Sequence, residues 1–143
     1  MNSKLTKLTQ LFLVVSALGF TASNAMSEVK LPKTAKLLNK AEIIVAYGGK
    51  TTNFEHPNTD KVIGTAIFSA DMTKGNGTFI AGSTKGEWES KITLKKDQYC
   101  WSSRVKGNKK FEKPVCNLVY LDGKVAYEVH PKTKLILSVN TIQ

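Results

Sequence analysis

The chain has 143 residues, with 21 lysines and arginines against 11 aspartates and glutamates, which gives a formal net charge of +10 at pH 7. This length predicts one domain with its own hydrophobic core, and no linker is long enough to separate two domains. The positive charge favours an acidic partner, such as an anionic lipid, an acidic glycan or an acidic protein. The alternative is a solvated, lysine-rich surface without a partner.

Residues 1–25 have the order of a secretory signal peptide. A short basic start precedes the apolar run 11–20, which is too short to span a bilayer, and Ser23 and Ala25 supply the small residues before a cleavage site. We therefore expect residues 26–143 to form an exported domain, periplasmic or secreted. Export argues against nucleic acid as a partner, and no later apolar run reaches transmembrane length.

A short helix is expected over about residues 35–47. Asn39 and Glu42 have the three-residue spacing of a capping box, and the two glycines at 48–49 can end the helix in a left-handed turn. The β-branched residues 43–45 leave a strand as the alternative.

After this helix, short apolar or alternating segments are separated by clusters of Gly, Asn, Asp, Pro and Lys, which is typical of an all-β domain. Within residues 87–94, the side chains at even positions, from Trp88 to Leu94, alternate with charged or polar ones. This alternation predicts one buried and one hydrated face. The expected strands cover approximately residues 50–56, 62–69, 77–82, 87–94, 98–105, 111–121, 124–130 and 135–141.

Turns at residues 107–109, 122–123 and 131–133 predict how the last four strands pair. The second turn would place Leu118 opposite Tyr127. The predicted registers gather one continuous apolar face across three strands, as the packed side of a sheet would have. This face consists of Leu118, Tyr120, Val125, Tyr127, Val129, Leu135, Leu137 and Val139.

Two cysteines in an exported chain predict a disulfide. The turn at 107–109 places Cys100 directly opposite Cys116, close enough in an antiparallel pair for the two sulfurs to join. Their spacing matches no common zinc pattern, and His56 and His130 lie far apart in the sequence, so we expect no metal or cofactor.

These elements predict a mainly β (α+β) domain, with a short N-terminal helix followed by an eight-stranded antiparallel meander. The meander would form either a small closed barrel, which removes exposed strand edges, or a strongly curved open sheet. The helix would plug one end or cover a face.

No motif in the sequence indicates catalysis. Gly49-Lys50-Thr51 lacks the earlier glycine of a phosphate-binding loop, because Ile44 stands in that place. Glu87 and Glu89 share one face of a strand, as an acid–base pair would, but a hydrated face is the favoured interpretation. We therefore expect a protein that is not an enzyme.

In a meander, alternate turns share one end of the sheet, so loops 57–61, 83–86, 106–110 and 131–134 should meet. The basic side chains at this end form a candidate anion-binding rim, although lysines also occupy exposed turns without a binding role. The rim residues are Lys85, Arg104, Lys106, Lys109, Lys110, Lys132 and Lys134.

Trp101 is a second candidate contact residue, which would either pack under the helix or lie exposed.

Several short motifs occur in the order of a known family: Gly49-Lys50-Thr51 after the helix, Gly86-Glu87-Trp88, Cys100 and Cys116. Over about residues 40–130 the chain resembles small exported proteobacterial proteins of unknown function. The resemblance implies an exported helix-plus-β domain and supplies no catalytic or ligand-binding residue.

We expect a small periplasmic or secreted binding module for an anionic or amphipathic envelope ligand. The alternative is a protein-interaction factor, such as an inhibitor of an exported enzyme.

Overall fold

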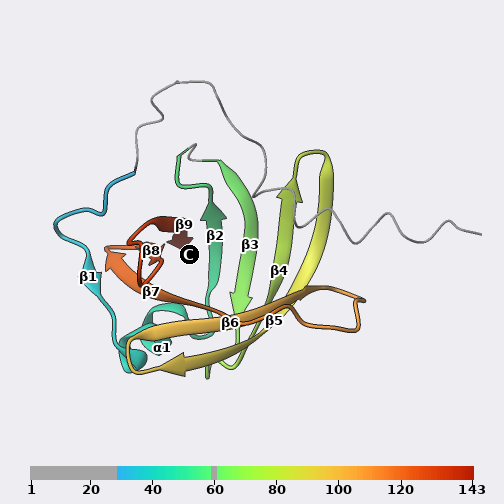
Figure 1. Ribbon diagram of the computed structural model, residues 1–143, viewed down its shortest axis with the longest axis horizontal. Coiled ribbons are helices and arrows are strands. Elements are labelled where there is room, and N and C mark those ends of the chain that lie inside the picture. The colour runs from blue at the N-terminus through green and yellow to red at the C-terminus, as the bar shows by residue number, and fades with distance from the viewer. Residues whose placement is uncertain (1–28, 59–60) are drawn as a thin grey trace, which may run out of the picture.

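The computed structural model describes residues 29–58 and 61–143, so the predicted signal peptide lies outside the described residues. Within these ranges there are one helix and nine strands (Figure 1). In chain order they are β1 (Lys36–Leu37), α1 (Lys40–Tyr47), β2 (Thr51–Glu55), β3 (Val62–Phe68), β4 (Lys74–Ala81), β5 (Thr84–Lys95), β6 (Gln98–Val105), β7 (Val115–Asp122), β8 (Val125–Val129) and β9 (Ile136–Ile142).

Strands β2 to β9 form an antiparallel meander in which each strand pairs with the next, and β9 also pairs with β2. The described part of the chain therefore forms an eight-stranded closed barrel, and the open curved sheet is excluded. The short strand β1 lies outside this meander, where Lys36 and Leu37 pair with Leu121 and Tyr120 of β7.

Helix α1 begins at the predicted capping box. The Glu42 backbone N–H donates to Asn39 Oδ1 (3.1 Å), and the Asn39 backbone N–H donates to Glu42 Oε2 (2.9 Å). Gly49, with a φ of 69°, turns the chain after the helix, as the sequence predicted. The predicted start at residue 35 is wrong, because residues 36–37 hydrogen-bond to β7 instead of entering the helix.

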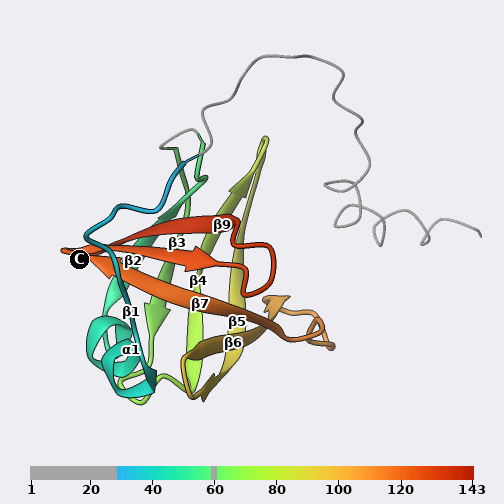
Figure 2. The ribbon, with the colours of Figure 1, turned by 60° about the vertical axis from the view of Figure 1, so that its left-hand side comes forward.

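Helix α1 plugs one end of the barrel. Ile43, Ala46 and Tyr47 are buried in the core, and the Lys40 backbone N–H donates to the Lys96 carbonyl in the β5–β6 turn (2.8 Å). In Figures 1 and 2, α1 lies at the lower left and the β4–β5 and β6–β7 loops lie on the opposite side. One end of the barrel is therefore closed by the helix, and the other end is formed by loops.

The predicted alternation in β5 is confirmed, since Ser90 and Ile92 are buried whereas Lys91 is exposed. Three strands begin at least three residues from the predicted position: β4 begins at Lys74 rather than residue 77, β5 at Thr84 rather than residue 87, and β7 at Val115 rather than residue 111. Residue 114 is a proline, which has no backbone N–H to donate to a ladder, so pairing with β6 starts after it.

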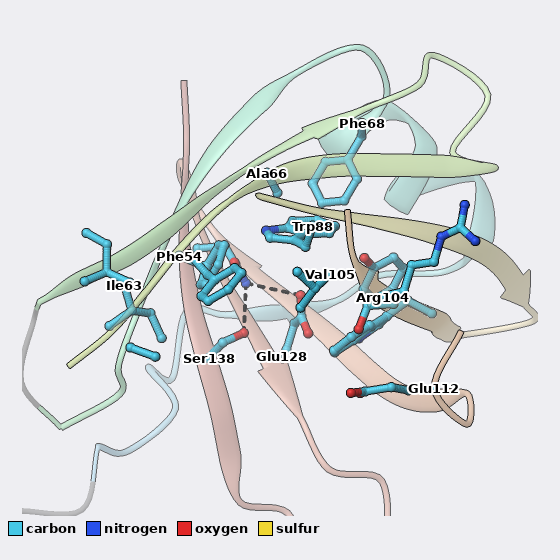
Figure 3. Close-up of a pocket in the computed structure, with 17 residues that line it drawn as sticks. Phe54, Ile63, Ala66, Phe68, Trp88, Arg104, Val105, Glu112, Glu128 and Ser138 are labelled. Carbon is cyan, nitrogen blue, oxygen red and sulfur yellow. Dashed lines mark hydrogen bonds between the residues drawn. The ribbon is translucent and has the colours of Figure 1, made fainter. Parts of the chain in front are cut away.

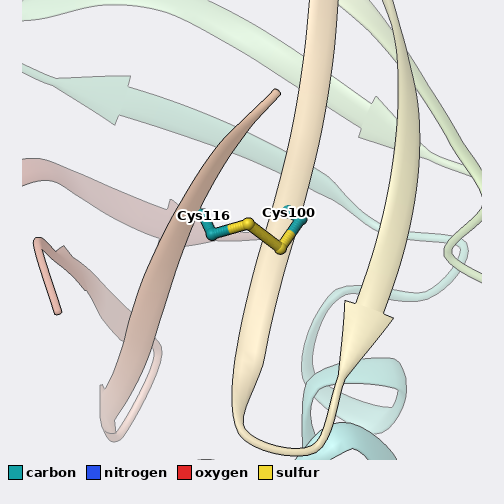
Figure 4. The surroundings of a disulfide bond; sticks show 2 residues. All are labelled: Cys100 and Cys116. Carbon is teal, nitrogen blue, oxygen red and sulfur yellow. A yellow bond between two sulfur atoms is a disulfide. The ribbon is translucent and has the colours of Figure 1, made fainter. Parts of the chain in front are cut away.

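The disulfide is confirmed, with Cys100 of β6 directly opposite Cys116 of β7 and a Cα–Cα distance of 4.0 Å (Figure 4). A disulfide is consistent with an oxidising compartment. Tyr99 and Trp101, the neighbours of Cys100, both line the barrel interior. Because side chains alternate along a strand, the disulfide points away from the cavity, and Cys100 is nevertheless buried, with 4% exposure.

The predicted registers of the last two hairpins are wrong by two residues. Asp122 pairs with Val125, so the turn residues are Gly123 and Lys124, and Leu118 faces Val129. The reason is that the glycine, with a φ of 60°, takes the first turn position, which is typical of a type II′ hairpin, rather than the second position of a type I′ hairpin.

The predicted apolar face lies on the outside of the barrel, not on its inside. Leu135 is 50% and Leu137 is 44% exposed, whereas Leu118 and Val129, which also point away from the cavity, are buried. The reason is that Tyr99 and Trp101 occupy the interior, which fixes the direction of every side chain in the adjoining strands. The interior positions of the last three strands are taken by Asn117, Val119, Leu121, Ala126, Glu128, Ser138, Asn140 and Ile142.

Candidate functional site

The barrel contains a cavity of about 400 Å³ that is partly open to solvent. Aromatic side chains from β2 to β6 line one part of it, and Glu128, Ser138 and Asn140 of β8 and β9 form a polar wall (Figure 3). Polar groups of β6 and of the β6–β7 loop also contribute, namely Ser103, Arg104 and Glu112. A mainly apolar pocket of this size with a few polar groups is typical of a small-molecule site. The aromatic residues that line the cavity are Phe54, Phe68, Phe79, Trp88, Tyr99 and Trp101.

Glycines on neighbouring strands make room for two of these rings. A Cβ on Gly64 would lie 2.2 Å from Phe54 Cζ, and a Cβ on Gly86 would lie 2.5 Å from the Phe79 ring. Both distances are shorter than any van der Waals contact, so each ring can occupy its position only because the glycine opposite it has no side chain. Gly86, the glycine of the Gly86-Glu87-Trp88 motif, thus makes room for Phe79 in the cavity wall.

Two tryptophans contribute to the wall in different ways. Trp88 is fixed, because its Nε1 donates to the Thr78 carbonyl (3.1 Å) and its ring meets Phe54 edge-on at 6.4 Å between centroids. Trp101 is half-buried in the wall, so it is neither packed under α1 nor fully exposed, the two outcomes that we expected. Its buried Nε1 has no hydrogen-bond acceptor among the described residues, which leaves it available to a bound molecule.

The polar wall is built around a buried carboxylate. Glu128 is 9% exposed, and its two oxygens accept hydrogen bonds from Asn117 Nδ2 (3.0 Å) and Asn140 Nδ2 (3.3 Å). Asn140 Nδ2 also donates to Ser138 Oγ (3.2 Å; Figure 3). Burial raises the pKa of Glu128, while the two amide donors partly oppose this shift. We call these four residues the polar cluster.

Two buried tyrosines lie within electrostatic range of the polar cluster. Burial raises the pKa of Tyr47, from α1, and of Tyr99, from β6, well above the usual value, and the charge of Glu128 adds to both shifts. The Tyr47 hydroxyl has no hydrogen bond of good geometry among the described residues, although the nearby Asn140 side chain partly opposes the rise of its pKa. The barrel interior near α1 therefore holds buried polar groups that the fold itself does not fully satisfy.

The predicted rim residues lie at the open end. The meander brings the β2–β3, β4–β5, β6–β7 and β8–β9 connections to the end opposite α1, as we expected. Two rim residues are neutralised, since Arg104 pairs with Glu89, and Lys106 with Glu87 at 2.8 Å. The remaining rim lysines make no ion pair with any described residue: Lys85, Lys109, Lys110, Lys132 and Lys134.

Arg104, one of the rim residues, holds the β6–β7 loop in place. Its guanidinium lies 4.3 Å from the Phe111 ring centroid and donates through Nη1 to the Lys109 carbonyl (3.3 Å). Lys91 Nζ lies 4.6 Å from the centroid of the same ring. These contacts hold the lysine-rich loop against β5 and β6.

Glu87 and Glu89 lie on the hydrated side of β5, where each forms an ion pair, so the interpretation as a hydrated face is confirmed. In the described residues, no three His, Cys, Asp or Glu side chains come together as metal ligands. None of the helices formed by those residues has the length and apolar character to cross a membrane. The arrangement as a whole is suited to binding a molecule inside the barrel.

Sequence reasoning missed the polar cluster. Its signal was the spacing of Asn117, Glu128 and Asn140, each two residues from a small or apolar residue (Val119, Ala126 and Ile142) that also points inward. Taken alone, each polar residue is indistinguishable from a hydrated one. To place them inside, one must first know that Trp101 points into the barrel. The pairing of Cys100 with Cys116 then relates that side of β6 to the same side of β7.

We compared the chain with models of known protein families, with curated proteins and with solved structures, and found no match. The resemblance to small exported proteobacterial proteins therefore stays a prediction.

Proposed function

We propose that this protein is an exported, periplasmic or secreted binding protein for a small amphipathic molecule that carries an anionic group. The observation behind the proposal is the aromatic cavity of about 400 Å³ inside a closed barrel whose loop end carries unpaired lysines. Eight-stranded barrels are wide enough to hold one small ligand. The apolar body of the ligand would enter the cavity, and its anionic group would remain at the lysines.

Exposed apolar side chains at the open end support an amphipathic ligand. Each connection at that end is flanked by at least one large apolar residue that is 41–50% exposed. The loop end of the barrel therefore carries both lysines and exposed apolar side chains, a combination that favours molecules with both an apolar and an anionic part. These apolar residues are Val62, Ile80, Val115, Leu135 and Leu137.

Two fluorescent probes with similar ring systems test this function. Anilinonaphthalene sulfonate is anionic, and phenylnaphthylamine is its uncharged counterpart. We expect both to bind in a 1:1 ratio with energy transfer from Trp88 and Trp101, and the anionic probe to bind more tightly at low salt. Filling the cavity by Ala66→Leu should weaken both probes. Failure of both probes to bind the folded protein would refute the proposal.

Matched lysine variants test the role of the rim. Lys132→Gln together with Lys134→Gln should weaken the anionic probe and leave the neutral probe unchanged. Lys40→Gln together with Lys124→Gln removes the same charge from the helix-plugged end. If both pairs of substitutions weaken the anionic probe equally, net charge rather than the rim explains its binding.

A vesicle assay identifies the source of the anionic group. Retention of the protein by anionic but not by neutral vesicles would identify a lipid as that source.

A second candidate function is a protein-interaction factor, such as an inhibitor of an exported enzyme. The β4–β5 hairpin favours it, since this hairpin extends beyond the neighbouring strands (Figure 2) and exposes Ile80. The lysines would direct such a contact toward an acidic protein. Recovery of one acidic protein in fixed ratio from an envelope extract, sensitive to salt, would support this function over ligand binding.

A further inference from the structure

The carboxylate of Glu128 is placed as a ligand-binding group rather than as part of the apolar core. It lines the cavity, is 9% exposed, and is held by amide groups from both neighbouring strands, Asn117 in β7 and Asn140 in β9. Both amides donate to it, so the surroundings are arranged for an oxygen acceptor in a fixed position.

No described cation compensates this carboxylate. The ion pairs of the described residues involve Glu42, Glu87 and Glu89, and Arg104, which also lines the cavity, is paired with Glu89. The hydroxyls of Tyr47 from α1 and Tyr99 from β6 are the titratable groups whose pKa responds to the charge of Glu128. An ionised carboxylate that has lost its water and gained no cation is strongly unfavourable in a protein interior. A positively charged group entering the cavity would remove this penalty.

The wall opposite the polar cluster suits the same kind of group. Trp88 and Trp101 line the cavity together with Phe54 and Phe68. The faces of aromatic rings attract organic cations, and tryptophan does so most strongly. A carboxylate on one side and aromatic rings on the other are the features by which proteins recognise alkylammonium groups.

We propose that the ligand carries a protonated amine, which binds inside the barrel between Glu128 and the aromatic wall. This inference rests on the proposed function and extends it: the ligand is an amphipathic amine whose ammonium group meets Glu128 and whose anionic group meets the lysines of the rim. The apolar body between them fills the aromatic part of the cavity.

Three small probes of nearly equal shape test the inference by calorimetry near neutral pH. Phenethylamine carries a cation, phenethyl alcohol is neutral, and hydrocinnamate carries an anion. We expect the affinity for the amine to exceed the affinity for the alcohol by about tenfold or more, which is the gain expected from one charge-assisted hydrogen bond. Glu128→Gln should remove this preference and leave the alcohol unchanged. Glu112→Gln, which removes an acid at the mouth of the same cavity, should change the preference less than about twofold.

The pH dependence of the unmodified protein decides the matter even if Glu128→Gln does not fold. Because burial raises the pKa of Glu128, lowering the pH toward that value protonates the carboxylate, and the amine should lose affinity while the alcohol does not. Equal binding of amine and alcohol, or a preference for hydrocinnamate, would overturn the inference and leave the proposed function standing. If the naphthalene probes fail as well, both proposals are overturned.

Discussion

Reduction of the disulfide should destabilise this fold by an amount that can be worked out from the chain. Cys100 and Cys116 are 16 residues apart. Closing a loop of this length lowers the entropy of the unfolded chain enough to stabilise the native state by about 3 kcal/mol at room temperature. The bridge also spans a weak part of the barrel, since β6 and β7 pair over only Gln98–Trp101 and Val115–Leu118.

Urea unfolding of the oxidised and reduced protein, followed by tryptophan fluorescence, measures this difference. We expect the free energy of unfolding to fall by about 3 kcal/mol on reduction, with little change in the dependence on urea. The double variant Cys100→Ala, Cys116→Ala serves as the control, because the reductant should not affect it. A loss below about 1 kcal/mol, or two free thiols in the unreduced protein, would refute the reasoning.

Three further predictions concern stability. Gly77→Ala should destabilise the fold by more than about 2 kcal/mol, because the new Cβ would lie 1.8 Å from the Thr65 carbonyl oxygen. Gly82→Ala, where the Cβ meets open space and only the φ of 59° is unfavourable, should cost about 1 kcal/mol. Equal urea midpoints for the two variants would contradict this. Asn39→Ala removes the cap of α1 and should lower the free energy of unfolding by about 1 kcal/mol, measured by thermal melting monitored by circular dichroism. The pKa of Glu128 is raised in the folded state, so the native protein binds more protons than the unfolded chain around this pKa. The contribution of Glu128 to the free energy of unfolding is therefore present at low pH and is lost as the pH rises through that pKa. Glu128→Gln should flatten the decline of stability over this range, and an unchanged pH profile would show that the carboxylate does not titrate there.

Local chemistry predicted most of the elements. The capping box of Asn39 and Glu42, the left-handed Gly49 and the alternation in β5 each depend on neighbours within a few residues, and each is confirmed. The pairing of Cys100 with Cys116 depends on one hairpin and is also confirmed. Closure of the barrel was left open, because it depends on β2 meeting β9, for which no local turn gives a signal.

The inside and outside of the last three strands were not predictable from their own pattern. Their outer face is the more apolar one, with Leu118 and Leu137, and their inner face carries Asn117 and Glu128. A pattern of this kind normally places the apolar side toward the core. Here the large aromatic residues of β2 to β6 supply the apolar wall of the cavity, and the remaining strands present polar groups to it.

The seam between β2 and β9 joins the first and last strands of the barrel, so that Thr141 donates to Glu55, 86 residues earlier in the chain. Contacts between such distant positions form late, because most of the polypeptide must already be ordered before they become favourable. Ser138 and Asn140 belong to that final strand. A chain still emerging from its site of synthesis thus lacks one wall of the cavity, and the proposed ligand would bind only after the C-terminal strand is in place.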